Sequence, residues 1–271
     1  MGAKSDRERL DTLLVTRGLV ENRTRAQALI LAGKVRTRGE RLDKPGHRLP
    51  VDIEIEVEKG KRWVGRGAEK LAPVLEQLEL SVSGATALDV GSSTGGFTQL
   101  LLELGAEQIF AIDVGKNQLD YRLRQDSRVT SMEGVNARYL EPTMFPKLAD
   151  LAVADLSFIS LEKVLPAVAN CLRAGASMVV LVKPQFEVGR EQVGRGGIVR
   201  DRELHFQVLE RIGRFALHQG WSVEAVNRAG LCGADGNQEY FMHVKLEAED
   251  TQEVDWESLL RPVTRLDGEI E

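Results

Sequence analysis

The sequence predicts an α/β protein in which a small α+β domain precedes a larger domain built on a doubly wound, mostly parallel sheet. Three observations predict this fold class. Apolar, strand-like runs alternate with helical stretches from Ala87 onward, whereas the first 60 residues contain two short helical patterns followed by short strand patterns. The chain of 271 residues, 42% of them hydrophobic, is also long enough for one large domain and one small domain.

The order of these patterns sets the domain boundaries. We expect the small domain in residues 1–60, a linker in 61–67, the large domain in 68–246 and an acidic tail in 247–271. The linker region combines basic residues and glycines with Trp63, whose ring either anchors the linker on a domain or stacks on a base. Residues 247–271 hold nine acidic and two basic side chains, which favours a solvated tail.

Charge, cysteine content and the amino terminus limit the class of protein. The formal net charge is -5, yet residues 1–50 hold twelve Lys or Arg against six Asp or Glu, which favours a nucleic-acid surface or else a merely solvated basic face. Cys171 and Cys232 form no CxxC pair, so neither a disulfide framework nor a zinc site is expected. The charged amino terminus and the lack of a run of roughly 18 apolar residues predict a cytoplasmic protein without a membrane segment.

The small domain begins with two predicted helices. Apolar residues from Leu10 to Leu14 lie at helical spacing, and Gly18 ends this first helix. Asn22 is a good N-cap for a second helix, which ends near Gly33. Short strands and turns follow, with a strand and its turn at 34–40, a turn at Pro45-Gly46, and a second strand through Ile53, Ile55 and Val57.

Basic side chains crowd the second helix and the turns of this domain, where several of them can face one phosphate-lined groove. A basic helical hairpin that docks a protein is the alternative. We expect further RNA contacts from the linker and from the glycine-rich segment 185–199 of the large domain. The predicted RNA-binding residues are Arg7, Arg17, Arg23, Arg25, Lys34, Arg36, Arg38, Arg41, Arg66, Arg190 and Arg195.

The large domain contains seven apolar runs with helical stretches between most of them. The expected strands are residues 87–90, 108–112, 129–132, 151–154, 177–182, 222–229 and 239–244. The last two strands follow a long helix at residues 202–219. This order predicts the Rossmann-like, seven-stranded sheet of methyltransferases with its reversed edge.

The first of these strands ends in a glycine-rich turn, DVGSSTGGFT at residues 89–98. Glycines let backbone amides approach a ligand that a Cβ would keep away. A dinucleotide site favours GxGxxG at a helix that faces pyrophosphate. Here an acid precedes GxxxGG, which better suits a phosphate-free cationic ligand such as S-adenosylmethionine. A glycine turn that serves only strand-to-helix packing is the alternative.

Two further residues at strand ends support the cofactor prediction. Asp113 ends the second strand, where it is placed to accept hydrogen bonds from ribose hydroxyls, and Asn136 follows the third strand near the expected adenine. The predicted cofactor-binding residues are Asp89, Gly91, Ser92, Ser93, Thr94, Gly95, Gly96, Phe97, Thr98, Asp113, Asn136 and Asp155.

Four charged residues predict chemistry on an alcohol. A hydroxyl is a poor nucleophile, so its methylation needs a base, and a lysine serves when desolvation or a nearby cation lowers its pKa. Lys183 ends an apolar strand, and Asp155 ends the strand expected beside it. Lys70 opens the first helix of the large domain, and Glu239 begins the last strand. Taken singly, each residue also fits an ordinary surface or capping role.

These patterns resemble known families over nearly the whole chain, from about residue 7 to 246. RLDxLLVxRGLxxNRxxAxxLIxxGKV in residues 9–35 resembles the alpha-L RNA-binding module of a small-subunit ribosomal protein, pseudouridine synthases and several rRNA methyltransferases. Lys70, Asp155, Lys183 and Glu239 match the tetrad of FtsJ-like ribose 2′-O-methyltransferases. RWVxRGAxKL, DVGSSTGGFT, DLSFISL and VKPQFEVGR are similar to motifs of the TlyA family, the hemolysin-A-like rRNA (cytidine-2′-O)-methyltransferases.

The resemblance implies methylation of a cytidine ribose in ribosomal RNA, on one or both ribosomal subunits, with S-adenosylmethionine as cofactor. In this mechanism Lys183 takes the hydroxyl proton, Lys70 and Asp155 tune and orient Lys183, and Glu239 positions Lys70 or the ribose. Two residues depart from the family pattern. Gly65 stands where Ser is common, and Glu69 is an extra acid beside Lys70 that can hold this lysine protonated.

Three other functions stay open at this point. A base methyltransferase would typically carry Asn-Pro-Pro-aromatic or a catalytic cysteine where this chain has DLSF at residues 155–158. A non-catalytic RNA-binding or ribosome-assembly factor would keep the fold without turnover. A pore-forming hemolysin would need a membrane-length segment, which the sequence does not offer.

Overall fold

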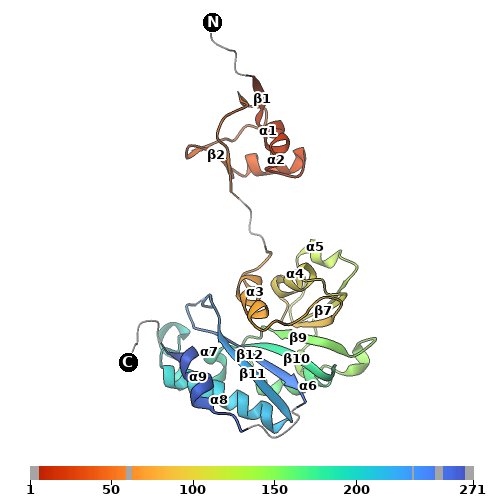
Figure 1. Ribbon diagram of the computed structural model, residues 1–271, viewed down its shortest axis with the longest axis vertical. Coiled ribbons are helices and arrows are strands. Elements are labelled where there is room, and N and C mark those ends of the chain that lie inside the picture. The colour runs from red at the N-terminus through yellow and green to blue at the C-terminus, as the bar shows by residue number, and fades with distance from the viewer. Residues whose placement is uncertain (1–5, 59–62, 234, 248–252, 266–271) are drawn as a thin grey trace. The chain divides into compact units, whose positions relative to one another are not determined.

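The computed structural model describes residues 6–58, 63–233, 235–247 and 253–265 (Figure 1). The chain forms two compact units, residues 1–62 and 63–271. The small domain was expected at residues 1–60 and the linker at 61–67. Residues 63–67 belong to the second unit, and residues 61 and 62 lie outside the described ranges.

The small unit contains the two predicted helices, α1 (Leu10–Thr16) and α2 (Arg23–Leu31). Asn22 caps α2 as expected, since its Oδ1 accepts a hydrogen bond from the Arg25 amide at 2.9 Å. Gly18, at φ +66°, follows α1 in the left-handed conformation that favours glycine. Apolar side chains of both helices fill one buried core with residues of the strands: Leu10, Leu13, Leu14, Ala26, Leu29, Ile30, Val35, Leu42 and Leu49.

The strands of the small unit differ in part from the prediction. They are β1 (Arg7–Arg9), β2 (Val35–Thr37), β3 (Glu40–Arg41), β4 (Arg48–Pro50) and β5 (Glu56–Val57). β1 pairs with β4, and β2 lies between β3 and β5. Of the strand expected through Ile53, Ile55 and Val57, only the end forms a strand, as β5. β1 and β4 were missed because each has only three residues, too few for an alternating pattern.

The large unit is built on one seven-stranded sheet in the order β11-β12-β10-β9-β6-β7-β8. Its strands are β6 (Thr86–Val90), β7 (Gln108–Asp113), β8 (Val129–Glu133), β9 (Ala149–Ala154), β10 (Leu172–Val182), β11 (Trp221–Arg228) and β12 (Tyr240–Leu246). Neighbours from β8 to β10 are parallel, and β12 is antiparallel to both β10 and β11. The reversed strand therefore lies one place inside the edge.

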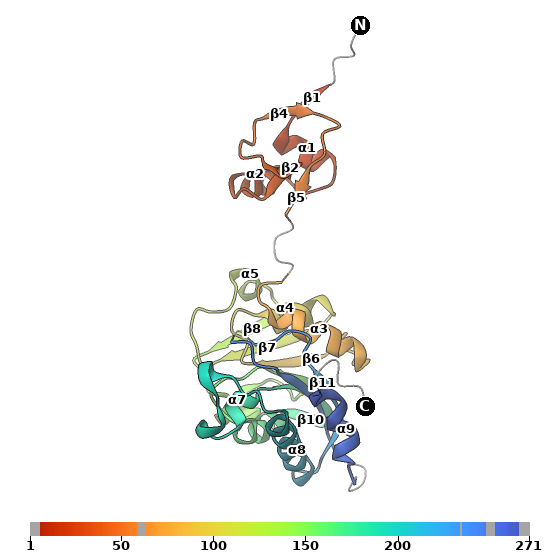
Figure 2. The ribbon, with the colours of Figure 1, turned by 90° about the vertical axis from the view of Figure 1, so that its left-hand side faces the viewer.

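Helices cover both faces of this sheet, as the doubly wound prediction requires. The helices of the unit are α3 (Gly67–Gln77), α4 (Gly96–Glu103), α5 (Tyr121–Arg124), α6 (Leu165–Ala169), α7 (Pro184–Glu187), α8 (Arg202–His218) and α9 (Trp256–Thr264). Figure 1 and Figure 2 show α3 and α4 on one face and α8 and α9 on the other. Among the described ranges, no helix is both long and apolar enough to span a membrane.

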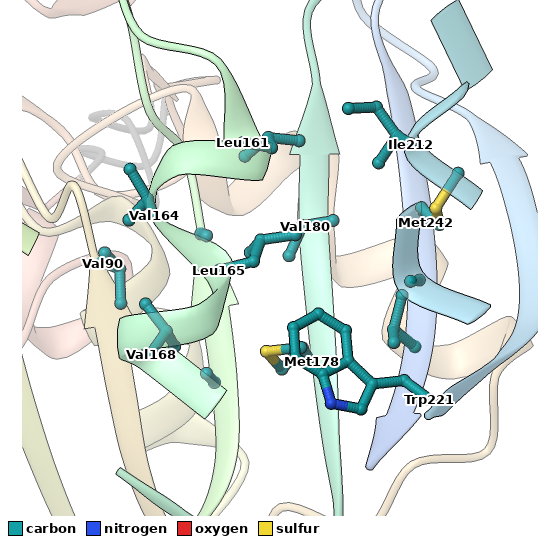
Figure 3. Packing of buried hydrophobic residues seen from close by; sticks show 14 of the residues in the cluster. Val90, Leu161, Val164, Leu165, Val168, Met178, Val180, Ile212, Trp221 and Met242 are labelled. Carbon is teal, nitrogen blue, oxygen red and sulfur yellow. The ribbon is translucent and has the colours of Figure 1, made fainter. Parts of the chain in front are cut away.

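The large unit has a hydrophobic core on each face of its sheet. Strand β10 contributes to both cores, because successive side chains of a strand point to opposite faces. Met178 and Val180 pack with Leu165 of α6 and Ile212 of α8 on one face (Figure 3). Val179 belongs to the core on the other face, beneath α3 and α4. Burial on both faces explains why β10 appears in the sequence as a continuous apolar run.

The prediction of a solvated tail at 247–271 was wrong for its central part, where α9 forms. Asp255 caps the helix by accepting a hydrogen bond from the Ser258 amide at 3.2 Å. Trp256, Leu260 and Thr264 recur every fourth residue and are buried. A Cβ on Gly213 of α8 would overlap the Trp256 ring, so α8 and α9 approach closely there. The helix was not predicted because the tail was interpreted from its excess of acidic residues and not from the helical spacing of its apolar residues.

Candidate active site

The candidate site lies where parallel strands of the large unit end. Gly91 follows β6, Asp155 follows β9 and Lys183 follows β10, so neighbouring strands deliver these residues to one edge of the sheet. The Asp155 amide donates to the carbonyl oxygen of Val90 at 2.9 Å, which joins the two strand ends. Ligand sites of doubly wound sheets form at the carboxyl ends of strands.

The glycine-rich loop keeps this edge open at Gly91. This residue has φ +87°, and a Cβ on it would overlap the carbonyl oxygen of Asp155. Gly95, at φ +95°, similarly leaves room for Leu123, and α4 begins directly after it. The loop therefore needs glycine at both positions for geometric reasons, whatever else it binds. Gly96, Phe97 and Thr98 belong to the first turn of α4 rather than to the loop.

Several predicted cofactor residues lie beneath the loop and not on its surface. The Thr98 hydroxyl donates to Asp89 Oδ2 at 2.5 Å, and both residues have no exposed surface. Burial raises the pKa of Asp89 to about 7. The Phe97 ring lies 6.2 Å from that of Phe241 and is also buried. The side chains of Asp89, Phe97 and Thr98 thus shape the loop from inside, whereas we had expected them to face the cofactor.

A cavity of about 440 Å³ opens beside the loop. Its lining combines apolar side chains with a few polar groups, as small-molecule sites do. Asp113 is fixed by two amides, since Ser93 N donates to its Oδ2 at 2.8 Å and Gly115 N to its Oδ1 at 2.7 Å. Asn136 accepts from the Arg138 amide at 3.1 Å. The lining residues are Gly91, Ser93, Ile112, Asp113, Val114, Gln118, Val135, Asn136, Ala137, Asp155, Leu156, Ser157, Phe158, Ile159 and Val164.

The four predicted catalytic residues form two ion pairs. Lys183 Nζ pairs with Asp155 Oδ1, as their neighbouring strands predicted, and it also donates to Ser157 Oγ at 3.0 Å. Lys70 Nζ lies 2.5 Å from Glu239 Oε2, with side chains only 8% and 4% exposed. Glu239 comes immediately before β12 and reaches across to α3. A buried pair of this kind keeps its geometry because separating the charges is unfavourable.

Lys70 and Asp155 also line a second, smaller cavity. It has a volume of about 190 Å³ and shares Gly91, Ser93 and Asp155 with the first cavity. Asp155 therefore lies between the two cavities. The remaining lining residues are Gly65, Arg66, Gly67, Lys70, Ser92, Thr94 and Phe97.

The end of the predicted linker forms one wall of this second cavity. The Val64 amide donates to Gln99 Oε1 at 2.9 Å, and Trp63 Nε1 donates to Glu103 Oε2 at 3.2 Å, so both residues are fixed on α4. Trp63 thus takes the anchoring role of the two considered. A Cβ on Gly65 would lie 2.7 Å from Thr94 Oγ1. Glycine at this position therefore fits its neighbours.

The extra acid Glu69 does not interact with Lys70 as we had considered. Glu69 is exposed on α3, whereas Lys70 is buried and pairs with Glu239. Adjacent helical residues point about 100° apart, which separates these two side chains.

Sequence reasoning missed an aromatic pair at the mouth of the larger cavity. Phe158 is 89% exposed and has φ +64°, an uncommon conformation for a bulky residue. Its ring lies 4.7 Å from that of Phe186, and the Phe186 ring lies 5.8 Å from Lys183 Nζ. The motif DLSF was noted for its acid, as a family motif and for its difference from base methyltransferases, but neither the exposure of Phe158 nor its backbone angle can be inferred from it. Backbone strain of this kind concentrates at functional sites.

The predicted RNA-binding arginines lie at the surface in both units, and Lys34 is half-buried. Arg17 is partly engaged within the small unit, because it donates to the carbonyl oxygens of Val51 and Ile53. Arg23 is held by Asp11, a fully buried carboxylate that also binds Arg9 and Gln27. Hydrogen bonds from Arg9 above all hold the pKa of Asp11 well below its usual range.

The segment that follows Lys183 is anchored at its far end. Asn237, two residues before Glu239, donates to the Gly197 carbonyl at 2.8 Å and accepts from the Val199 amide at 3.0 Å. His205 lies 2.9 Å from the Val199 carbonyl oxygen and 2.7 Å from the Tyr240 hydroxyl. Burial lowers the pKa of His205. The arginine-bearing segment is thus fixed to the chain around Glu239.

The parallel sheet with its inserted reversed strand, the glycine loop and the two lysine pairs define a Rossmann-like methyltransferase. Residues 63–246 match the family described as FtsJ-like methyltransferase, and residues 8–55 match the S4 domain. The chain belongs to the FtsJ-like methyltransferase family, with an S4 domain ahead of the methyltransferase domain. Both family assignments agree with the resemblances found in the sequence.

Individual relatives extend over almost the whole chain. The 16S/23S rRNA (cytidine-2′-O)-methyltransferase TlyA of Mycobacterium tuberculosis is 44% identical over 90% of this chain and 91% of its own. Hemolysin A of Brachyspira hyodysenteriae is 39% identical over 87% of this chain and 98% of its own. A solved structure described as a hemolysin from Streptococcus thermophilus has 41% identity, covers 96% of both chains and superposes with a TM-score of 0.71.

Proposed function

We propose that this protein transfers a methyl group from S-adenosylmethionine to the 2′-hydroxyl of a cytidine ribose in ribosomal RNA. The observation that carries the proposal is the Lys183–Asp155 pair, which stands at the ends of two parallel strands beside the cavity of the glycine loop. The name of the M. tuberculosis relative supports the choice of ribose, cytidine and ribosomal RNA.

The larger cavity suits the proposed cofactor. Asp113, fixed by two amides, is placed to accept hydrogen bonds from ribose hydroxyls, and Asn136 and apolar side chains such as Leu156 line the space for a flat base. Gly91 leaves a cradle that a Cβ would fill. When bound, S-adenosylmethionine supplies an electrophilic methyl group. Of the residues predicted to bind it, Ser92, Ser93, Thr94 and Gly95 form the turn beside Gly91, and Gly96 begins α4.

Lys183 is the proposed general base. The Lys183 ammonium first gives up a proton, and the resulting amine takes the proton from the attacking 2′-hydroxyl, while Asp155 and Ser157 hold Nζ in place. The side chain of Lys183 is only 10% exposed, so little water competes for this proton. Alignment of the hydroxyl with the transferred group supplies most of the rate, and the fixed positions of Lys183 and Asp155 serve that alignment.

Lys70 and Glu239 act as a fixed charged wall of the smaller cavity. Because Glu239 holds Lys70 Nζ at 2.5 Å, the side chain of Lys70 keeps one position in the cavity that Asp155 also lines. In this proposal the smaller cavity receives the target ribose, and Lys70 orients it.

The S4 domain and the basic segments of the large unit bind the RNA in this proposal. Phosphate contacts from exposed arginines fix register, and Phe158 offers its exposed ring for stacking on the target base. The proposed phosphate contacts are Arg7, Arg17, Arg23, Arg25, Lys34, Arg36, Arg38, Arg41, Arg66, Arg190 and Arg195. Stacking of a base is worth about 1–3 kcal/mol.

Transfer of tritiated methyl groups to ribosomal RNA tests this function. We expect Lys183→Met to lose at least about a thousandfold in kcat, because both the base and the alignment it provides are removed. Lys245→Met is the matched control, since Lys245 is an exposed lysine on β12. Calorimetry with S-adenosylmethionine separates a non-catalytic RNA-binding factor, which would release no heat. Equal incorporation by wild type and Lys183→Met would contradict the proposal.

A further inference from the structure

A buried carboxylate lies behind the candidate active site. Glu187 is the last residue of α7, the short helix that begins directly after Lys183. Its side chain is only 2% exposed. Because a buried carboxylate without partners is strongly unfavourable, the groups around Glu187 indicate its purpose.

The two carboxylate oxygens of Glu187 bind two different segments. Oε1 accepts a hydrogen bond from the Leu161 amide at 2.8 Å, at the start of η3 (Leu161–Lys163). Oε2 accepts from Arg211 Nη2 of α8 at 2.9 Å, and the same nitrogen donates to the Glu187 carbonyl oxygen at 2.9 Å. Glu187 thus joins the segment after β9, the segment after β10 and helix α8.

The segments joined in this way carry the catalytic groups of the proposed function. Residues 155–161 contain Asp155 and Phe158, and residues 183–187 contain Lys183 and Phe186. On the active-site side the two segments meet through the Lys183–Asp155 pair and the tilted contact between the rings of Phe158 and Phe186. On the buried side they meet through Glu187 and the Leu161 amide.

We propose that Glu187 and Arg211 form a clamp that positions the two catalytic segments, so that Lys183 and Asp155 keep their working geometry. This inference rests on the proposed methyl transfer. Neither residue touches the candidate substrate or cofactor cavities, so both act as positioning residues.

Arg211 provides a positive charge beside the buried Glu187 carboxyl, which favours its ionised form. Its Nε also lies 3.0 Å from Glu162 Oε1, so one guanidinium bridges two carboxylates. The charged groups that face Glu187 are Arg211 from α8 and Glu162 from η3. Burial raises the pKa of Glu187, and the negative charge of Glu162 adds to this rise. Hydrogen bonds from the Leu161 amide and the Ser160 hydroxyl, together with the positive charge of Arg211, lower the same pKa.

Kinetics of three variants test the clamp. Arg211→Met leaves the Glu187 carboxylate buried without its cation, and we expect kcat to fall about tenfold or more at pH 8 with little change in the KM for RNA. Glu187→Gln in the Arg211→Met background removes the stranded charge and keeps an acceptor for the Leu161 amide. We expect this double variant to recover to within about threefold of wild type. Arg214→Met is the control, because Arg214 pairs with Glu210 at the surface of the same helix.

The pH dependence separates positioning from general destabilisation. Without Arg211 the raised pKa of Glu187 rises further, so the carboxyl is protonated and tolerated at low pH and becomes ionised as the pH rises. Arg211→Met should therefore show a new loss of kcat with rising pH that is absent from wild type and from the double variant. A kcat loss that is equal at all pH values, or unrescued by Glu187→Gln, overturns the clamp.

Amide hydrogen exchange gives a readout that does not depend on activity. Exchange of residues 156–163 should be faster in Arg211→Met by about fivefold or more and near wild type in the double variant. Faster exchange together with no RNA methylation by wild type would remove the proposed function and leave the structural clamp in place. Unchanged exchange and unchanged kcat in Arg211→Met would overturn the clamp while methyl transfer stands. Where Arg211→Met does not fold, Glu187→Ala, which removes the acceptor of the Leu161 amide, takes its place and is expected to quicken the same exchange; unchanged exchange in this variant would overturn the clamp.

Discussion

Replacement of Gly91 by alanine is the most direct perturbation of the proposed cofactor cradle. A Cβ on Gly91 would lie 3.0 Å from the carbonyl carbon of Asp155 and closer still to its oxygen. Because ordinary contact begins at 3.4 Å, the Asp155 peptide must retreat by about 0.4 Å at the carbon and by more at the oxygen. A left-handed alanine adds about 1 kcal/mol. Misplacement of a catalytic group by about 1 Å lowers rates by about a hundredfold.

We therefore expect Gly91→Ala to lower kcat by roughly tenfold to a hundredfold, weaken the binding of S-adenosylmethionine and reduce the free energy of unfolding by about 2–3 kcal/mol. Calorimetry, methyl transfer to RNA and urea unfolding measure the three effects. Gly84→Ala is the matched control, because Gly84 also has a positive φ of +73° but its Cβ would enter open space. It should lose about 1 kcal/mol and no activity. Wild-type cofactor affinity and rate in Gly91→Ala would refute the reasoning.

Three other predictions concern charge, packing and RNA binding. The pKa of Asp89 is raised from 3.8 to about 7, so between these pH values the folded protein keeps a proton that the unfolded chain releases. The free energy of unfolding should therefore fall as the pH rises from about 4 to about 7. Urea unfolding at several pH values should show a smaller fall for Asp89→Asn. Trp256→Ala should lower the free energy of unfolding by about 3 kcal/mol, because it removes a buried aromatic ring. An unchanged free energy of unfolding would instead favour the interpretation of residues 247–271 as a solvated tail. Asp11→Asn makes the S4 domain more positive but removes the carboxylate that holds Arg9 and Arg23 in place. Because arginines in fixed positions set the contacts to phosphates, we expect this variant to bind RNA more weakly in a filter-binding assay. Tighter binding would mean that the net charge alone determines the affinity.

The sheet of the large unit could be predicted largely because inner strands such as β6, β9 and β12 are buried along nearly their whole length and appear as apolar runs. Six of the seven strands begin within two residues of the prediction. The contact between Lys183 and Asp155 also followed, since neighbouring parallel strands end at the same edge. β10 begins at Leu172, five residues before the expected start, because the exposed residues at its beginning break the apolar run.

The rest of the site depends on contacts that no local pattern records. Lys70 and Glu239 are separated by 169 residues and meet only because α3 packs beside the start of β12. The exposure of Phe158 depends on a positive φ that a phenylalanine does not signal. Arg211 belongs to the long helix predicted at 202–219, whereas Glu187 falls in the segment 185–199 that was expected as a glycine-rich loop and forms the end of α7 instead. Their contact depends on how α7 packs against α8. Long-range pairs of this kind require the three-dimensional structure.

Mass-spectrometric mapping of the methylated atom in ribosomal RNA tests the central claim most directly. RNA treated with wild-type protein and S-adenosylmethionine should yield, after nuclease digestion, a cytidine that carries its new methyl group on the ribose. The same digest from Lys183→Met should contain none above background, while Lys245→Met should match wild type. A methyl group on a base, or a ribose methylated equally by Lys183→Met, would contradict the assignment of Lys183 as the base for a 2′-hydroxyl.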